Sequence, residues 1–262
     1  MKTRLTDSMV PVFIFLSLVI VFFLGFPVLK ILLSVTPAAL FKTLILQEVT
    51  RSFLLTFYCG LVATLLGLIV GVPLAYVLAR SEFPGKRVIE GIIDMPVILP
   101  HSAAGIALLF VFGRHFMVGK AFGAIGIDFV GEVPGIVIAM LFVSVPFLVN
   151  AAKEGFKKVD VKYEQAARSL GASPWTAFFT IALPLAGSGI LSGAIMMWAR
   201  GLSEFGAVLI ITYHPMIAPI LVYNYFENFG LEHTVPVVAL LILLTLVFFT
   251  LLRWLNYRWE KR

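Results

Sequence analysis

The sequence has few charged residues and almost no cysteine. Only 13% of its 262 residues are charged, against roughly 25% in a typical soluble domain, while 60% are hydrophobic and the mean hydropathy is +1.02. The single cysteine, Cys59, excludes an internal disulfide and a cysteine-rich metal site. The composition therefore indicates a membrane protein, and we expect no metal in it.

Six long apolar segments are predicted to cross the bilayer as helices. Each is long enough for a hydrocarbon core of roughly 30 Å, which takes about 20 helical residues. We therefore expect an all-α membrane protein forming a single domain over residues 1–262. The predicted spans are Met9–Leu33, Ser52–Ala79, Val88–Phe112, Pro134–Ala152, Leu185–Thr212 and Val235–Leu255.

The basic residues are distributed unevenly between these spans. With the N-terminus inside the cell, fourteen of the 20 Lys and Arg residues fall in cytoplasmic segments and five in external ones. This pattern satisfies the positive-inside rule. We therefore expect a multi-pass protein of the cell membrane, with both termini and a polar loop at about 153–184 in the cytoplasm. Since topology accounts for the net charge of +6, lipid is the expected surrounding and no nucleic-acid partner is predicted.

Within that loop, Val161–Pro184 predicts two short helices joined by a tight turn. Gly171 stands where a helix ends in a left-handed residue, and Ser173 and Pro174 are typical of the first positions of the next helix. The residues that share one face of the first helix are Tyr163, Ala166, Ala167 and Leu170. A short helix with a small-residue face suits contact with another protein, and an amphipathic helix on the bilayer surface is the alternative.

The third span carries polar residues and two prolines in its middle. Pro96 and Pro100 interrupt the helical hydrogen bonds, and Asp94, His101 and Ser102 lie around the break. Irregular backbone at this depth is tolerated where protein or a water-filled cavity covers it. We interpret the segment as a wall or gate of a pathway, and the alternative is a kinked structural helix.

The fifth span places a cation and an anion deep in an apolar segment. Arg200 and Glu204 are four residues apart and can pair, which would make them a structural ion pair. Charges inside a membrane are costly and usually mark function, so partners elsewhere are also expected. The candidate partners are Glu90, Asp94 and His101. The predicted pathway residues are Asp94, Pro100, His101, Ser102, Arg200, Ser203 and Glu204.

The cytoplasmic loop resembles that of ABC importer permeases, which reads E-A-A, three residues, G, nine residues, I-x-L-P. The matching positions are Ala166, Ala167, Gly171, Ile181, Leu183 and Pro184. One position departs from the pattern, because Gln165 replaces the family's Glu and Glu164 precedes it. The resemblance implies a coupling helix that sits in a groove of a separate ATPase subunit. The residues expected to make that contact are Tyr163, Glu164, Gln165, Ala166, Ala167, Arg168, Leu170 and Gly171.

Three further stretches resemble oxyanion permeases. Ala199–Ala207 is similar to the A-R-x-x-x-E-F-G-A segment of molybdate, tungstate and sulfate permeases. Asp94–His101 and Tyr213–Pro219 are similar to the archaeal-type molybdate/tungstate branch. The resemblance implies a homodimer of non-catalytic permeases, two ATPase subunits that bind ATP and Mg, and an extracytoplasmic oxyanion-binding protein. It implies transport by alternating access, with no cofactor bound by this chain.

Two rival functions remain open on the sequence. A sulfate or thiosulfate permease would use the same machinery for a different ion. An ATP-independent secondary transporter would use Asp94, Glu204 and His101 as a proton relay. A membrane-bound enzyme is disfavoured because the sequence shows no convincing catalytic constellation.

Overall fold

The computed structural model describes residues 9–260, and within that range its regular elements are helices, which confirms the predicted all-α class. The basic residues Lys2, Arg4, Lys261 and Arg262, counted above as cytoplasmic, lie outside the described residues. The chain divides into two compact units. One comprises Met1–Thr50 and Val222–Leu244, and the other comprises Arg51–Leu221 and Thr245–Arg262.

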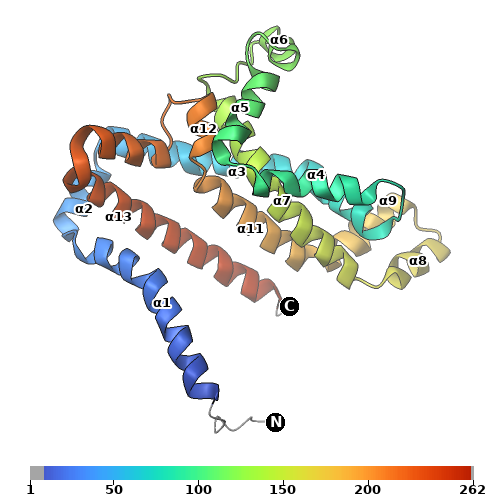
Figure 1. Ribbon diagram of the computed structural model, residues 1–262. Helices are drawn as coiled ribbons and strands as arrows, with labels where there is room; N and C mark the ends of the chain where they lie inside the picture. The colour runs from blue at the N-terminus through green and yellow to red at the C-terminus, as the bar shows by residue number, and fades with distance from the viewer. Residues whose placement is uncertain (1–8, 261–262) are drawn as a thin grey trace. The chain divides into compact units, whose positions relative to one another are not determined.

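Long apolar helices dominate both units (Figure 1). By length and composition, four helices of the described residues can cross a membrane, and two bent helix pairs raise the number of spans to as many as six, the predicted number. The four helices are α1 (Met9–Leu33), α3 (Gln47–Arg80), α7 (Val133–Lys158) and α13 (Ala218–Glu260). The helices of the bent pairs are α4 (Lys86–Ile98) with α5 (His101–Phe112), and Pro174–Leu185 with α11 (Gly187–Leu202).

The remaining helices are short. They are α2 (Pro37–Leu44), α6 (Met117–Gly123), α8 (Val161–Ser169), α9 (Pro174–Ala177), the π-helix η1 (Phe178–Ala182), α10 (Leu183–Leu185) and α12 (Gly206–Ile211). Three of them, α9, η1 and α10, make up the Pro174–Leu185 half of the second bent pair.

The third span is broken, as its prolines predict. The axes of α4 and α5 differ by 117° at the break. Leu99 and Pro100 both have extended backbone there, and α5 begins directly after them. Pro100 has no N–H to continue the ladder of α4, so the break coincides with the second proline rather than the first. Pro96 lies inside α4.

Two other spans differ from their predicted bounds. The fifth span was expected to run continuously to Thr212, but α11 ends at Leu202 and α12 begins only at Gly206. Pro184 lies within α10, and the 69° bend falls at Ala186. The run of α13 starts before the predicted sixth span, but it consists of two helices that meet in a kink at Gly230, whose φ of +73° glycine tolerates. The helix after the kink contains the predicted Val235–Leu255.

The larger unit is organised around α7, which packs along α11. Gly155 of α7 and Gly189 of α11 meet so closely that a Cβ on Gly189 would lie 2.7 Å from the Cα of Gly155. Farther along, a Cβ on Gly193 would lie 3.0 Å from the carbonyl oxygen of Leu148. Small residues permit this backbone-to-backbone approach, so α7 and α11 form a tightly packed pair.

Candidate functional site

The cytoplasmic loop forms the two predicted helices, and both ends of its turn are capped as expected. The N–H groups of Gly171 and Ala172 donate to the carbonyls of Arg168 and Ala167, both at 3.0 Å, while Gly171 adopts a φ of +91°. These two bonds form the Schellman arrangement that ends a helix. Ser173 then accepts from the N–H of Thr176 at 3.1 Å. Both helices are therefore fixed by local hydrogen bonds.

One face of α8 is exposed and partly apolar. Tyr163 is 60% exposed and Leu170 is 89% exposed, and Gln165 and Ala166 are exposed beside them. Trp175 of α9, 70% exposed, lies just after the turn. Trp175 was not among the predicted contact residues, although its position at the start of the second helix of the loop could have indicated a role in the contact. Large exposed side chains around small ones are typical of a protein-binding surface.

Glu164 points the other way, into the protein. It is only 7% exposed, and its carboxylate lies 2.7 Å from Nη2 of Arg80 and accepts a hydrogen bond of 2.6 Å from the hydroxyl of Tyr76. Arg80 also donates to the carbonyl of Val159 at 3.0 Å. The expectation that Glu164 belongs to the docking surface therefore needs correction, because this side chain anchors α8 to the end of α3.

A second cluster joins the breaks in the third and fifth spans. Nη2 of Arg200 lies 3.0 Å from Oε2 of Glu204 and 3.0 Å from Nε2 of His101, and Nδ1 of His101 lies 3.2 Å from Oε2 of Glu204. Oε1 of Glu204 accepts from the N–H of Ala207 at 2.9 Å, which caps the start of α12. The predicted pair thus forms, and His101, one of the three suggested partners, joins it.

The other two suggested partners lie elsewhere. Asp94 accepts a hydrogen bond of 2.6 Å from Asn150 of α7, and Glu90 lies 3.1 Å from the ammonium of Lys153. Both contacts join α4 to α7. Asp94 and Glu90 therefore hold α4 against α7. The sequence did not predict this contact, because the residues around Asp94 and Glu90 do not indicate which helix packs beside α4.

The remaining predicted pathway residues lie around the cluster. Ser203 accepts from Nη1 of Arg200 at 3.3 Å and donates to the Arg200 carbonyl. Pro100 precedes α5, and Ser102 lies beside His101 at its start. A Cβ on Gly206 would approach that of His101 to 2.7 Å, so the close contact of α5 with α12 depends on glycine.

The buried member of the cluster is the anion. The Glu204 side chain is 1% exposed, whereas that of Arg200 is 22% exposed and that of His101 is 48% exposed. The nitrogens of Arg200 and His101 therefore form the exposed side of the cluster, which we call its open side. Among the described residues, no group of three or more His, Cys, Asp or Glu side chains is placed to hold a metal ion.

Comparison with known proteins identifies the type of chain. The family described as binding-protein-dependent transport system inner membrane component matches residues 63–262, which include α8 and the Arg200 cluster. The chain belongs to this family. It is therefore a multi-pass membrane component of a transport system, in agreement with its apolar helices.

Similar proteins within this transport family cover nearly the whole chain. The molybdate/tungstate transport system permease protein of Pyrococcus furiosus is 42% identical over 251 residues, 95% of this chain and 96% of the relative. That of Thermococcus kodakarensis is 46% identical over 208 residues, 79% of this chain and 78% of the relative. A bacterial ABC transporter involved in the import of the acidic polysaccharide alginate matches with a TM-score of 0.75 over 96% of both chains. At 13% identity this last match shows the fold alone.

Proposed function

We propose that this chain is the permease subunit of an ATP-driven importer of tetrahedral oxyanions, with molybdate and tungstate as substrates. The observation that carries this proposal is the 42% identity to a molybdate/tungstate permease across 95% of the chain. The chain itself carries out no covalent chemistry. It provides the path, and a separate ATPase subunit binds ATP and Mg.

In this proposal α8 is the coupling helix. Its exposed Tyr163 and Leu170 enter a groove of the ATPase, and Trp175 adds to the contact. The ion pair of Glu164 with Arg80 ties α8 to α3, so that a movement of the ATPase reaches the membrane helices instead of only bending a loop. This use of α8 places the loop and both termini in the cytoplasm, as the distribution of basic residues predicts.

The Arg200 cluster is proposed as part of the gate. It joins the breaks in two spans, and its cation is more exposed than its carboxylate. An anion arriving from the open side meets guanidinium and imidazole nitrogens, while Glu204 balances the charge of Arg200 from behind. This arrangement lowers the cost of an anion in the membrane without creating a permanent tight site.

The proposed assembly has two copies of this permease, two ATPase subunits and an extracytoplasmic oxyanion-binding protein. ATP binding closes the ATPase pair, α8 transmits the movement, and the path changes from inward-facing to outward-facing. The binding protein then delivers the oxyanion, and hydrolysis resets the path.

Reconstitution tests this function directly. The permease is placed in proteoliposomes with the ATPase and binding protein, and uptake of labelled molybdate is measured with and without ATP. We expect uptake only with the complete system. Uptake by the permease alone would indicate an ATP-independent transporter, and competition by sulfate as strong as that by tungstate would indicate a sulfate permease.

A further inference from the structure

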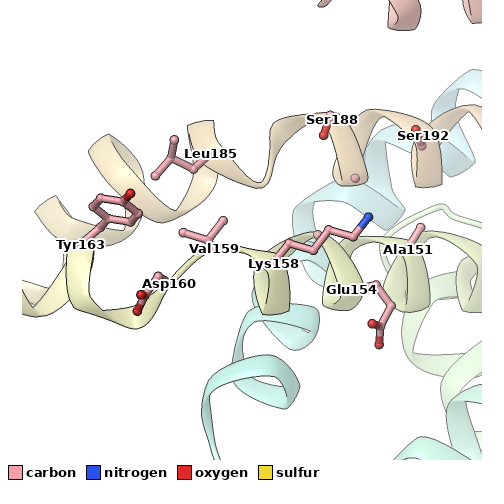
Figure 2. Close-up of a pocket in the computed structure, with 11 residues that line it drawn as sticks. Ala151, Glu154, Lys158, Val159, Asp160, Tyr163, Leu185, Ser188 and Ser192 are labelled. Atoms are coloured by element: carbon pink, nitrogen blue, oxygen red, sulfur yellow. The ribbon is translucent and has the colours of Figure 1, made fainter. Parts of the chain in front are cut away.

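A polar groove of about 580 Å³ lies where the C-terminal end of α7, the start of α8 and the first turns of α11 meet (Figure 2). The polar side chains that line it are Glu154, Lys158, Asp160, Tyr163, Ser188 and Ser192. We propose that this groove is a binding site for a tetrahedral oxyanion, separate from the Arg200 cluster and held by the ammonium of Lys158 and the hydroxyl of Ser188.

The two carboxylates of the groove have cationic or N–H partners of their own. Oε1 of Glu154 lies 2.9 Å from the ammonium of Lys157, and Asp160 accepts from the N–H of Lys162 at 2.9 Å, capping α8. In Figure 2 both carboxylates point away from α11. They therefore do not form the part of the groove that faces Ser188 and Ser192.

Lys158 differs from Lys157 and Lys162 in where its ammonium points and, among the described residues, in its lack of a carboxylate partner. Its ammonium points toward the helix that carries Ser188 and Ser192 (Figure 2), and over the described part of the chain no carboxylate lies within ion-pair distance of it. An ammonium and a hydroxyl on facing elements, here Lys158 of α7 and Ser188 of α11, are donors that suit an oxyanion, and a charge-assisted bond supplies most of the affinity.

The position of the groove on α11 suggests which anion occupies it. Ser188 and Met196 are exposed on α11, Ser192 and Arg200 are partly buried, and Ser203 is exposed just after the helix ends. These residues recur about every four positions, so they form one stripe. The stripe runs about 18 Å from Ser188 to Arg200, at 1.5 Å per residue. It links the groove to the gate cluster.

The groove is thus the cytoplasmic end of the path, where a transported molybdate or tungstate pauses before release. This assignment rests on the proposed function for the identity of the anion. The donors of the groove stand on α7 and α11, and Tyr163 of the coupling helix contributes to the same wall, so the site lies beside the element that contacts the ATPase.

Binding to the complete permease–ATPase complex tests the inference. The complex is placed in nanodiscs of zwitterionic lipid without binding protein, and equilibrium binding of labelled molybdate is measured. Lys158→Met should reduce affinity about tenfold or more, the effect of losing a charge-assisted hydrogen bond, and Ser188→Ala should reduce it less. The matched control, Lys120→Met, removes the same charge from an exposed residue of α6, outside the groove, and should change affinity less than twofold.

The outcomes separate this inference from its rivals. Equal binding by wild type and Lys158→Met, or equal losses in Lys158→Met and Lys120→Met, would overturn it. Lys158-dependent retention of phosphatidylglycerol, with no molybdate binding in zwitterionic discs, would assign the groove to a lipid phosphate instead. If wild type imports molybdate but Lys158→Met binds normally, only this inference fails. If the complete system imports no oxyanion, the proposed function fails, whatever Lys158 binds.

Discussion

Arg80 and Glu164 stand 84 residues apart in the sequence and form an ion pair of 2.7 Å between the last turn of α3 and α8, the proposed coupling helix. Their side chains are 11% and 9% exposed, so neither charge is well solvated. Tyr76, one turn before Arg80, donates to the same carboxylate. These three side chains anchor the proposed docking element to the membrane part of the chain.

Breaking this anchor should loosen α8 and weaken ATPase binding. Glu164→Gln leaves Arg80 without its anion, and removing one partner of a buried pair costs about 3 kcal/mol. We expect a lower melting temperature of the purified permease and reduced copurification of the ATPase. Glu82→Gln is the control, because its side chain is 90% exposed and its pair with Lys86 contributes little. Equal behaviour of the two variants would argue against the anchor.

The turn after α8 depends on the backbone of Gly171. Its φ of +91° is unfavourable for a β-branched residue, whereas the space around it is open, so Gly171→Val acts only through the backbone. We expect a cost of about 1–2 kcal/mol and weaker association with the ATPase. Gly91→Val is the control, because Gly91 has equally open space and lies within α4 without a positive φ. Unchanged copurification with Gly171→Val would contradict this role of the turn.

The exposed face of α8 should tolerate substitution in the isolated permease but not in the complex. Leu170→Asp places a charge on a residue that is 89% exposed, so the permease should keep its melting temperature. The affinity for the ATPase should fall about tenfold or more, because the complex would bury the new charge in the groove of the ATPase subunit. Ser169→Asp adds the same charge on a different face and should have a much smaller effect on affinity, measured by titration of the ATPase. A similar loss with both variants would show only a general effect of charge.

Arg200 should matter for uptake rather than assembly. Arg200→Leu removes the partly buried cation of the proposed gate, and molybdate uptake should fall about tenfold or more while the ATPase still copurifies. Arg200→Lys keeps the charge but loses the planar guanidinium that bridges Glu204 and His101, so its uptake should be intermediate. Wild-type uptake by Arg200→Leu would make Arg200 a purely structural partner of Glu204.

Sequence reasoning was most successful where structure is determined locally. The turn at Gly171 and the cap at Ser173 follow from nearest neighbours. The Arg200–Glu204 pair forms as predicted, although α11 ends at Leu202 and Glu204 lies in the gap after it. The break at Pro100 follows from the missing N–H. The prediction that these residues serve docking and transport stays a prediction.

Contacts between distant segments could not be predicted in the same way. Glu164 was predicted to be part of the docking surface. Its burial could not be predicted locally, because it depends on Arg80 and Tyr76, which lie in another span. The gap between α11 and α12 coincides with Ser203 and Glu204, which the sequence analysis interpreted as pathway residues of a continuous helix, and Glu204 itself caps the new helix. Pro184 does not mark the bend in the fifth span, because α10 begins one residue earlier and accommodates it, and the bend falls at Ala186.

The contact of Gly155 with Gly189 has a mechanical consequence. Because the backbones of α7 and α11 are in contact at these glycines, neither helix can slide or tilt without the other. The two helices therefore move as one rigid body. In the proposed assembly, a displacement that the ATPase imposes where α7 leads into α8 would therefore reach the far end of α11, beside the Arg200 cluster, almost undiminished.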